Sequence, residues 1–349
     1  MAVLSRSSAG DVRWVSEAVI RCRSHRVISR SIRRPRALTA LAMAISFIAC
    51  HRARSDDETP AERRPDLTRL RAIIDSVGGA SRGTLGVGVE LIETRERLVV
   101  GTYHHPMQSV YKLPIAMAVL DRVDRGTLRL DQDVTVPVSM FVTRGQHSPI
   151  RDKYPNGTQL SLREILRYNT AESDGTACDV LLKLIGGPRE AMRYLEQIDV
   201  SELIVATTEL EMGHDHRAQY RNWATPAGAL ALLRVVQEGR TLSDTSEAML
   251  LRFLTETTTG PGRLRGDLPV GTVVAHKTGS SGTADGVAAA TNDIGIITMP
   301  NGQHLAVAVF LTDSRAEDGA RDRTIAAVAR AAWETFVAAT VQPTAGQRP

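Results

Sequence analysis

The chain has 349 residues, of which 42% are hydrophobic and 4% aromatic, a composition that fits a globular protein with an ample core and excludes a disordered chain or a polytopic membrane protein. The formal net charge of +4 arises in the first 50 residues, which hold nine Arg, no Lys and two acidic residues. The remainder has 34 basic and 37 acidic residues, so nothing in it indicates a nucleic-acid partner.

The first 50 residues have the pattern of an export signal with an unusually long start. Arg33, Arg34 and Arg36 precede an uncharged stretch, residues 37–49, that is too short to span a bilayer but suits the apolar region of a signal peptide. Cys50 follows this stretch as in a bacterial lipoprotein signal, where the Cys is lipidated and becomes the mature N-terminus; simple cleavage nearby is the alternative. We therefore expect an exported protein, either periplasmic or tethered to the outer membrane through a lipidated Cys50.

Secondary structure begins after a linker. Residues 51–65 are polar and charged with two prolines, which is typical of a tether. Apolar residues at helical spacing predict a first helix over 67–77. Two runs with strand composition, 85–92 and 97–103, predict an antiparallel hairpin.

Ser109 and Lys112 follow the predicted hairpin and precede an apolar run, 113–120, whose length favours a helix. Residues three apart are neighbours on a helix, so the hydroxyl and the amine are expected to meet. A serine hydroxyl needs a base, and a desolvated lysine with a lowered pKa can serve. The pair alone is a weak signal, because a helix-capping Ser beside a solvated Lys has the same spacing.

The remaining chain changes from helical to strand periodicity after Gly271. The predicted helices are 162–168, 176–185 and 226–236, and the last is 316–339. The predicted strands are 272–276, 293–299 and 304–311.

Strands at both ends and helices between them predict a mixed α/β (α+β) fold. We expect an antiparallel sheet flanked by helices, with an all-helical domain inserted into it. The sheet part comprises residues 66–112 and 263–340, the inserted helical part 113–262, and the tail 341–349.

Two further motifs indicate that the pair Ser109 and Lys112 belongs to a catalytic site. Ser173-Asp174-Gly175 lies between two predicted helices, and Lys277-Thr278-Gly279-Ser280 ends a predicted strand. In this order the three motifs resemble the set found in serine β-lactamases and penicillin-binding proteins, which share the β-lactamase/D,D-peptidase-like fold. Glu209 lies in a non-periodic stretch, about 200–224, where class A β-lactamases carry the omega loop and its deacylating glutamate.

Four shorter segments are most similar to the extended-spectrum branch of class A typified by the PER and VEB enzymes. They are residues 209–212, 219–223, 257–261 and 290–295.

The resemblance implies hydrolysis of the β-lactam ring of penicillins and cephalosporins through a serine acyl-enzyme, giving antibiotic resistance. Ser109 would attack the lactam carbonyl, and neutral Lys112, or Glu209 through a water, would take its proton. Ser173 would return a proton to the leaving nitrogen. The backbone N–H groups of Ser109 and Ser280 would form the oxyanion hole.

The same resemblance implies further roles around the substrate. The substrate-binding positions are Lys277, Thr278, Gly279, Ser280, Arg263 and Gly175. Asp174 and Asp179 would support the site structurally. No metal and no organic cofactor are expected, and the partner would be a small-molecule β-lactam bound by a monomer.

Departures from the family pattern leave questions open. Gly175 and Gly213 stand where many members carry Asn, the second of which helps to hold the hydrolytic water, and Asp179 replaces an Asn that bonds the peptide of the glutamate. A D,D-peptidase shares the motifs but normally lacks Glu209. A β-lactam sensor that is acylated once would sit on a transmembrane signalling module, which the sequence after the leader does not contain.

Overall fold

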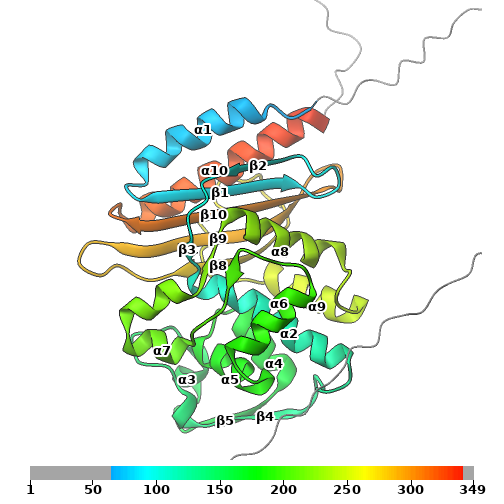
Figure 1. Cartoon of the computed structure of the whole chain (residues 1–349), viewed down its shortest axis with the longest axis vertical. Coiled ribbons are helices and arrows are strands. Elements are labelled where there is room, and N and C mark those ends of the chain that lie inside the picture. Colours follow the sequence, from blue (N-terminus) through cyan, green and yellow to red (C-terminus); the bar gives the residue numbers. More distant parts are fainter. Residues whose placement is uncertain (1–63, 341–349) are drawn as a thin grey trace, which may run out of the picture. The chain divides into compact units, whose positions relative to one another are not determined.

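The computed structural model describes residues 64–340, and its centre is a five-stranded antiparallel sheet (Figure 1). The strand order is β2-β1-β10-β9-β8. The first strand, β1, therefore pairs with the last, β10. The strands are β1 Thr84–Leu91, β2 Arg97–Val100, β8 Val274–Ser280, β9 Ala288–Thr298 and β10 His304–Ser314. The antiparallel sheet and the mixed α/β class are as predicted.

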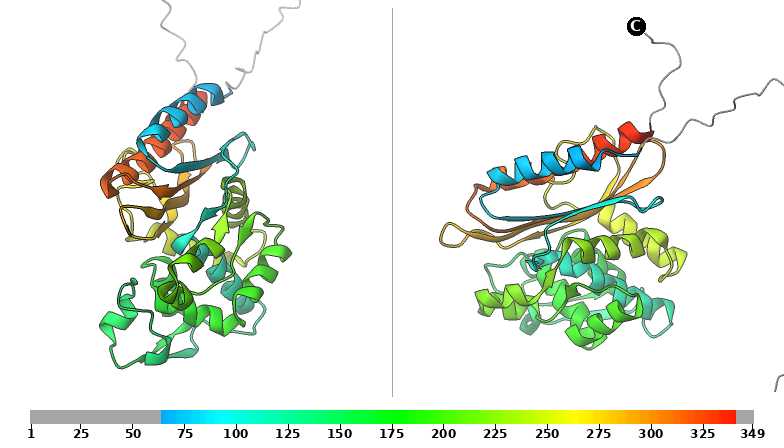
Figure 2. Two further views of the ribbon diagram at one scale, coloured as in Figure 1. Left: turned by 60° about the vertical axis from the view of Figure 1, so that its left-hand side comes forward. Right: turned by 45° about the horizontal axis from the view of Figure 1, so that its top comes forward.

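Helices cover both faces of this sheet. Helices α1 (Leu67–Ala80) and α10 (Asp318–Thr340) pack against each other on one face, and the other helices lie on the opposite side (Figure 2). Those helices are α2 Lys112–Asp124, α3 Pro149–Lys153, α4 Leu162–Thr170, α5 Gly175–Ile185, α6 Pro188–Gln197, α7 Glu209–His214, α8 Pro226–Glu238 and α9 Asp244–Thr255. None of these described helices combines the length and the apolar character that a bilayer crossing requires.

Shorter elements connect the helices. Two small sheets contain β3 His105–Pro106, β6 Leu203–Ile204 and β7 Trp223–Ala224, and β4 Asp133–Val136 with β5 Thr158–Ser161. The 3₁₀ turns are η1 Gln108–Tyr111, η2 Val138–Met140 and η3 His216–Arg221.

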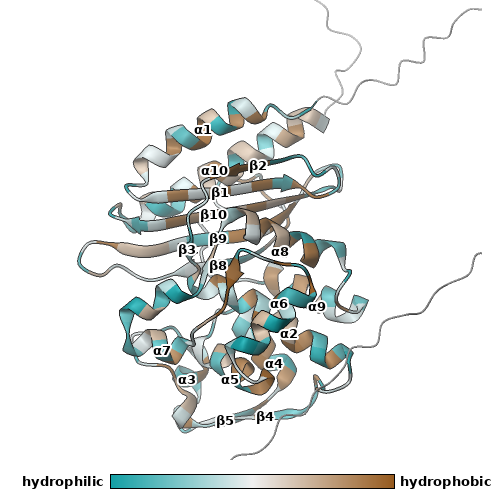
Figure 3. Cartoon of the chain, viewed as in Figure 1, coloured by the Kyte–Doolittle hydropathy of each residue, from teal (hydrophilic) through white to brown (hydrophobic). Residues whose placement is uncertain are grey.

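The central strand β10 is apolar on both faces because both faces are covered. Val307 and Val309 pack in the core beneath α1 and α10, whereas the alternate residues Ala306, Ala308 and Phe310 pack against the helices opposite. This two-sided burial explains why the strand reads as a continuous apolar run rather than an alternating one. In Figure 3, hydrophilic residues instead gather on peripheral helices such as α6 and α7.

Several boundaries differ from those predicted. β2 ends at Val100 rather than Tyr103, since Gly101 takes a positive φ of 83° that breaks the extended chain. The stretch 200–224 is not a plain loop, because α7 and η3 lie within it. The described sheet strands come from 84–100 and 274–314, while the domain boundaries themselves stay a prediction. The predicted signal peptide, Cys50, most of the linker and the tail lie outside the described residues.

Candidate active site

Ser109 and Lys112 lie where the 3₁₀ turn η1 passes into α2. Ser109 is inside the turn and Lys112 is the first residue of α2, so the local backbone is helical, as the spacing predicted. Lys112 Nζ donates a hydrogen bond to Ser109 Oγ at 2.7 Å, and the lysine is 1% exposed. This contact removes the alternative of a solvated lysine.

The turn that carries Ser109 is fastened to the sheet. Asn292 on β9 donates from Nδ2 to the carbonyl oxygens of Pro106 at 2.8 Å and Met107 at 3.1 Å. Gly279 on β8 allows the close approach, because a Cβ there would lie 2.2 Å from the Met107 oxygen. The Lys-Thr-Gly glycine therefore brings β8 directly beside Ser109.

Glu209 begins α7 and reaches the same lysine. Thr208 caps the helix by accepting a hydrogen bond from the Glu211 backbone N–H. The Glu209 carboxylate forms a buried ion pair with Lys112 Nζ. Asp179 on α5 accepts hydrogen bonds from the backbone N–H groups of Glu209 and Leu210, both at 2.8 Å, which anchors the start of the helix.

The charge state of Lys112 differs from the expectation of a lowered pKa. Burial is the largest single influence and favours the neutral amine. The attraction and hydrogen bond of Glu209, with Cys178 and Asp174, together outweigh it and raise the pKa of Lys112. Lys112 is therefore a cation in the free protein. Glu209 is its counter-ion, a direct pairing that the sequence did not predict.

Ser173 and Lys277 form a second hydroxyl–amine pair facing the first. Ser173 joins α4 to α5 with a positive φ of 58°, a strained conformation that is common at functional sites. Lys277 Nζ donates to Ser173 Oγ at 2.8 Å. Burial, helped by the charge of Lys112, lowers the pKa of Lys277 to about 7, which makes this lysine the more readily deprotonated of the two.

Asp174 stabilises the loop that carries Ser173. Its carboxylate accepts hydrogen bonds from the backbone N–H groups of Ile150 at 2.6 Å and Ala177 at 2.8 Å, and from Ser148 Oγ at 3.1 Å. The side chain is fully buried. These contacts anchor the connection between α4 and α5.

Arg263 lies behind the end of β8. Its Nη2 donates to Ser280 Oγ at 2.8 Å, its Nη1 to the Asn292 oxygen at 2.9 Å, and its Nε to Asp322 at 2.8 Å. The guanidinium therefore orients the Ser280 hydroxyl through the hydrogen bond from Nη2.

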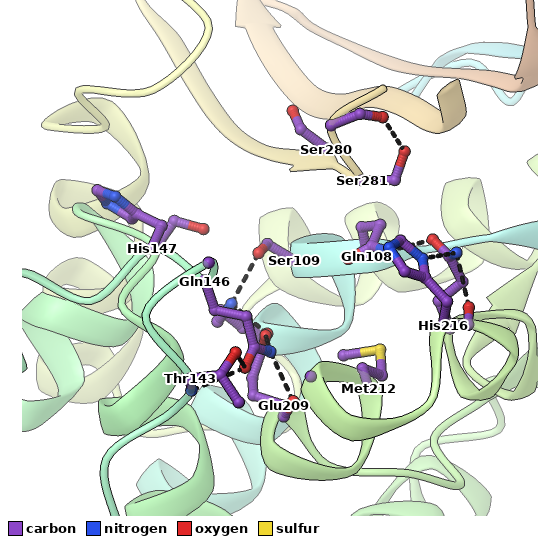
Figure 4. A pocket seen from close by; sticks show the side chains of 16 residues that line it. Gln108, Ser109, Thr143, Gln146, His147, Glu209, Met212, His216, Ser280 and Ser281 are labelled. Atoms are coloured by element: carbon purple, nitrogen blue, oxygen red, sulfur yellow. Dashed lines mark hydrogen bonds and ion pairs between the residues drawn. The ribbon is translucent and has the colours of Figure 1, made fainter. Parts of the chain in front are cut away.

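A cavity of about 350 Å³ opens over these residues. Among the residues singled out from the sequence, its walls include Ser109, Lys112, Ser173, Glu209 and Ser280. In Figure 4, Ser280 and Ser281 lie on the far side of Ser109 from Glu209.

Five of the predicted substrate-contacting residues do not form walls of this cavity. Lys277, Thr278, Gly279 and Arg263 are buried. Gly175 is also buried, with Val142 and the His147 backbone within about 3.3 Å of where its Cβ would be. Direct substrate contact by these residues stays a prediction. Within residues 64–340 there is also no group of three or more His, Cys, Asp or Glu side chains that could hold a metal ion.

A model of the β-lactamase enzyme family matches residues 68–336. The chain belongs to this family. Among its relatives, β-lactamase VEB-1 of Pseudomonas aeruginosa is 38% identical over 76% of this chain and 89% of that protein. The extended-spectrum β-lactamase PER-1 of Pseudomonas aeruginosa is 41% identical over 76% of this chain and 86% of that protein.

A solved structure agrees with the sequence relatives. A β-lactamase from Chitinophaga pinensis DSM 2588 superposes with a TM-score of 0.75 at 42% identity, over 77% of this chain and 99% of that one. The resemblance to the PER and VEB branch of the class A β-lactamases is therefore confirmed.

Sequence motifs did not identify the cavity wall formed by the loop between η2 and α3. This wall of the β-lactamase site contains Thr143, Gly145, Gln146 and His147. The loop matches none of the three motifs, and its approach to α7 depends on a contact between residues 63 positions apart. The only available signal was indirect, namely the unexplained Gly213.

Asp179 gives this β-lactamase a pH-dependent stability. Burial, followed by repulsion from Glu209, raises the pKa of Asp179 to about 7, whereas an unfolded Asp titrates near 3.9. The folded state thus binds the extra proton between these values, and the contribution of Asp179 to stability is greatest below about pH 4 and declines until about pH 7.

Replacing Asp179 with Asn should remove that decline. Guanidinium unfolding at pH 5 and pH 8 is expected to give a smaller loss of unfolding free energy for Asp179→Asn than for wild type as the pH rises. Asp152→Asn, the same substitution at an exposed position on α3, offers a matched control for the loss of a carboxylate. Parallel pH profiles for Asp179→Asn and wild type would contradict the assignment.

Proposed function

We propose that this chain hydrolyses penicillins and cephalosporins through an ester on Ser109, and so confers antibiotic resistance. The observation that carries the proposal is the buried series of contacts from Ser109 through Lys112 to Glu209, which opens on the cavity. It places a nucleophile, a cation and a carboxylate in direct contact, with the lysine and the carboxylate buried. Such an arrangement provides both proton transfer and electrostatic stabilisation of charge that develops during acyl transfer.

Acylation needs a route for the proton of Ser109. Because Lys112 is a cation, it first has to release a proton, and Glu209 is in contact to receive it. Lys112 can then accept the Ser109 proton across the 2.7 Å hydrogen bond as the oxygen attacks the lactam carbonyl. The backbone N–H groups of Ser109 and Ser280 supply the oxyanion hole.

The lactam nitrogen must gain a proton when the C–N bond breaks. Ser173 supplies it, and Lys277 restores the Ser173 proton across their 2.8 Å hydrogen bond. The carboxylate of the bound substrate lies next to Lys277, Thr278 and Ser280. Its negative charge favours the protonated form of Lys277 before the proton moves to Ser173. Arg263 supports the Ser280 hydroxyl.

Deacylation separates a β-lactamase from a D,D-peptidase or a sensor. Acylation leaves a proton on Glu209 and removes one from Lys277, and proton exchange with solvent in the cavity restores both groups. A water that attacks the ester needs a base about 3 Å away, and the restored Glu209 carboxylate lies on the cavity wall next to Ser109. The segment of about residues 200–224 that carries it serves as the omega loop. The presence of Glu209 therefore favours hydrolysis over the two alternatives.

Steady-state hydrolysis tests the proposal. The purified protein should turn over many equivalents of a chromogenic cephalosporin and of a penicillin. Relatives include enzymes named extended-spectrum, so an oxyimino cephalosporin belongs in the same panel. Release of a single equivalent followed by arrest would favour a sensor, and cleavage of D-Ala-D-Ala peptides without β-lactam turnover would favour a peptidase.

We also propose that the protein is exported and lipidated at Cys50. Support comes from the arginines and the uncharged stretch that precede this cysteine in the sequence. The native protein should enter the detergent phase and carry acyl mass on Cys50, and Cys50→Ala should release it to the aqueous phase. A mature N-terminus elsewhere, without acyl mass, would contradict lipidation.

A further inference from the structure

Gln146 connects the loop before α3 to the start of α7. Its Nε2 donates to the backbone oxygen of Glu209 at 2.6 Å and lies 3.4 Å from the Glu209 carboxylate oxygen Oε2 (Figure 4). Its Oε1 accepts hydrogen bonds from the Thr143 backbone N–H at 3.1 Å and from Thr143 Oγ1 at 3.0 Å. Because a backbone N–H can only donate, this contact fixes the amide oxygen toward Thr143 and the NH₂ group toward Glu209.

Gly213 makes room for this amide. It lies four residues after Glu209 in α7, so a side chain there would stand beside that of Glu209 on the same helix face. A Cβ on Gly213 would lie 2.2 Å from Gln146 Oε1 and 2.8 Å from its Cδ. Gln146 therefore fills the space that a side chain on α7 would otherwise occupy.

Three groups together fix the orientation of Glu209. Lys112 contacts carboxylate oxygen Oε1, the Gln146 amide faces Oε2, and Asp179 holds the backbone N–H. Lys112 also serves Ser109, and Asp179 touches only the backbone. Gln146 is the neighbour whose NH₂ group reaches both the backbone and the second carboxylate oxygen of this residue.

We propose that Gln146 is a positioning residue for deacylation, acting through Glu209. The inference rests on the proposed function, in which Glu209 activates the water that hydrolyses the ester. A general base works only when its lone pair points at the attacking water, and small displacements of such a group cost up to about 10²-fold in rate. The Gln146 amide supplies that alignment by holding the first turn of α7 and the outer carboxylate oxygen.

Gln146→Met separates positioning from simple space filling. Methionine has nearly the same length but no N–H donor. We expect kcat for a cephalosporin to fall by about tenfold, with KM falling in proportion and kcat/KM unchanged, because acylation by Ser109 is intact. Intact mass spectra under turnover should show a larger fraction of acylated protein than for wild type.

A second pair of variants tests the shared space. Gly213→Asn alone should disturb the site, since its side chain meets Gln146. In a Gln146→Ala background the same Asn gains room, with Thr143 Cγ2 at 3.0 Å the remaining close neighbour, and should return part of the lost kcat. Arg144→Ala, an exposed change on the same loop, is the control with unchanged kinetics.

Two results would overturn the inference while leaving the proposed function intact. One is wild-type kcat in Gln146→Met, which would make the amide donor irrelevant. The other is an equal fall in kcat and kcat/KM, which would place the defect in acylation. If the wild-type protein itself forms no ester, the proposed function fails first, and the inference falls with it.

Discussion

Replacing Ser109 with alanine should abolish β-lactam hydrolysis, lowering kcat by on the order of 10⁴-fold or more, as removal of a nucleophile does in other serine hydrolases. Lys112, Glu209 and the oxyanion donors remain, but no bond to the carbonyl carbon can form. The variant should still bind the substrate, because the residues proposed to hold the substrate carboxylate are unchanged. Initial rates with a chromogenic cephalosporin measure the loss.

The Ser109→Ala protein also serves to exclude a second nucleophile. Ser173 lines the same cavity and accepts a hydrogen bond from Lys277, so among the other hydroxyls on the cavity wall it is the candidate with an amine beside it. A fluorescent penicillin should label wild type but not Ser109→Ala. Labelling of the variant, or turnover within tenfold of wild type, would move the nucleophile to another residue.

Replacing Glu209 with glutamine should lower turnover by about 10²-fold or more, the scale of lost general-base catalysis. Acylation should survive, because losing Glu209 also changes the pKa of Lys112. The attraction of Glu209 raises the pKa of Lys112, and burial opposes it. Without the carboxylate, the main attraction that opposes burial is lost, so the pKa of Lys112 should fall and favour the neutral amine that can take the Ser109 proton directly.

Glu211 provides a matched control for this change. It lies two residues further along α7, where its carboxylate accepts hydrogen bonds in the capping box with Thr208 and is not part of the cavity wall. Glu211→Gln should retain turnover close to that of wild type. Turnover of Glu209→Gln at the level of this control would show that another group activates the water.

The sequence predicted the residues that lie around Ser109 because each belongs to a short motif with its own local geometry. A helical turn is enough to join Ser109 to Lys112. The strand predicted to end before Lys277 instead continues through it to Ser280. Ser173 lies on a short connection between helices, where the sequence indicated a loop. These placements needed only local rules and the order of the motifs.

Features that depend on contacts between distant segments could not be read from the sequence. The pKa of Lys112 was expected to fall with burial, but it rises because Glu209 lies against it. Gly213 looked like a missing side chain until the structure placed Gln146 in the same space. No local sequence pattern links Gly213 to Gln146, because the two residues are far apart in the sequence and come into contact only in the folded chain.

Intact mass spectrometry of wild type and Glu209→Gln with the same cephalosporin tests the central claim most directly. Glu209→Gln should gain the mass of the drug on Ser109 within the first seconds and keep it, while wild type returns to its unmodified mass as the drug is consumed. Wild-type protein that stays acylated for hours, or Glu209→Gln that never gains the mass, would contradict the acyl-enzyme mechanism proposed for this β-lactamase.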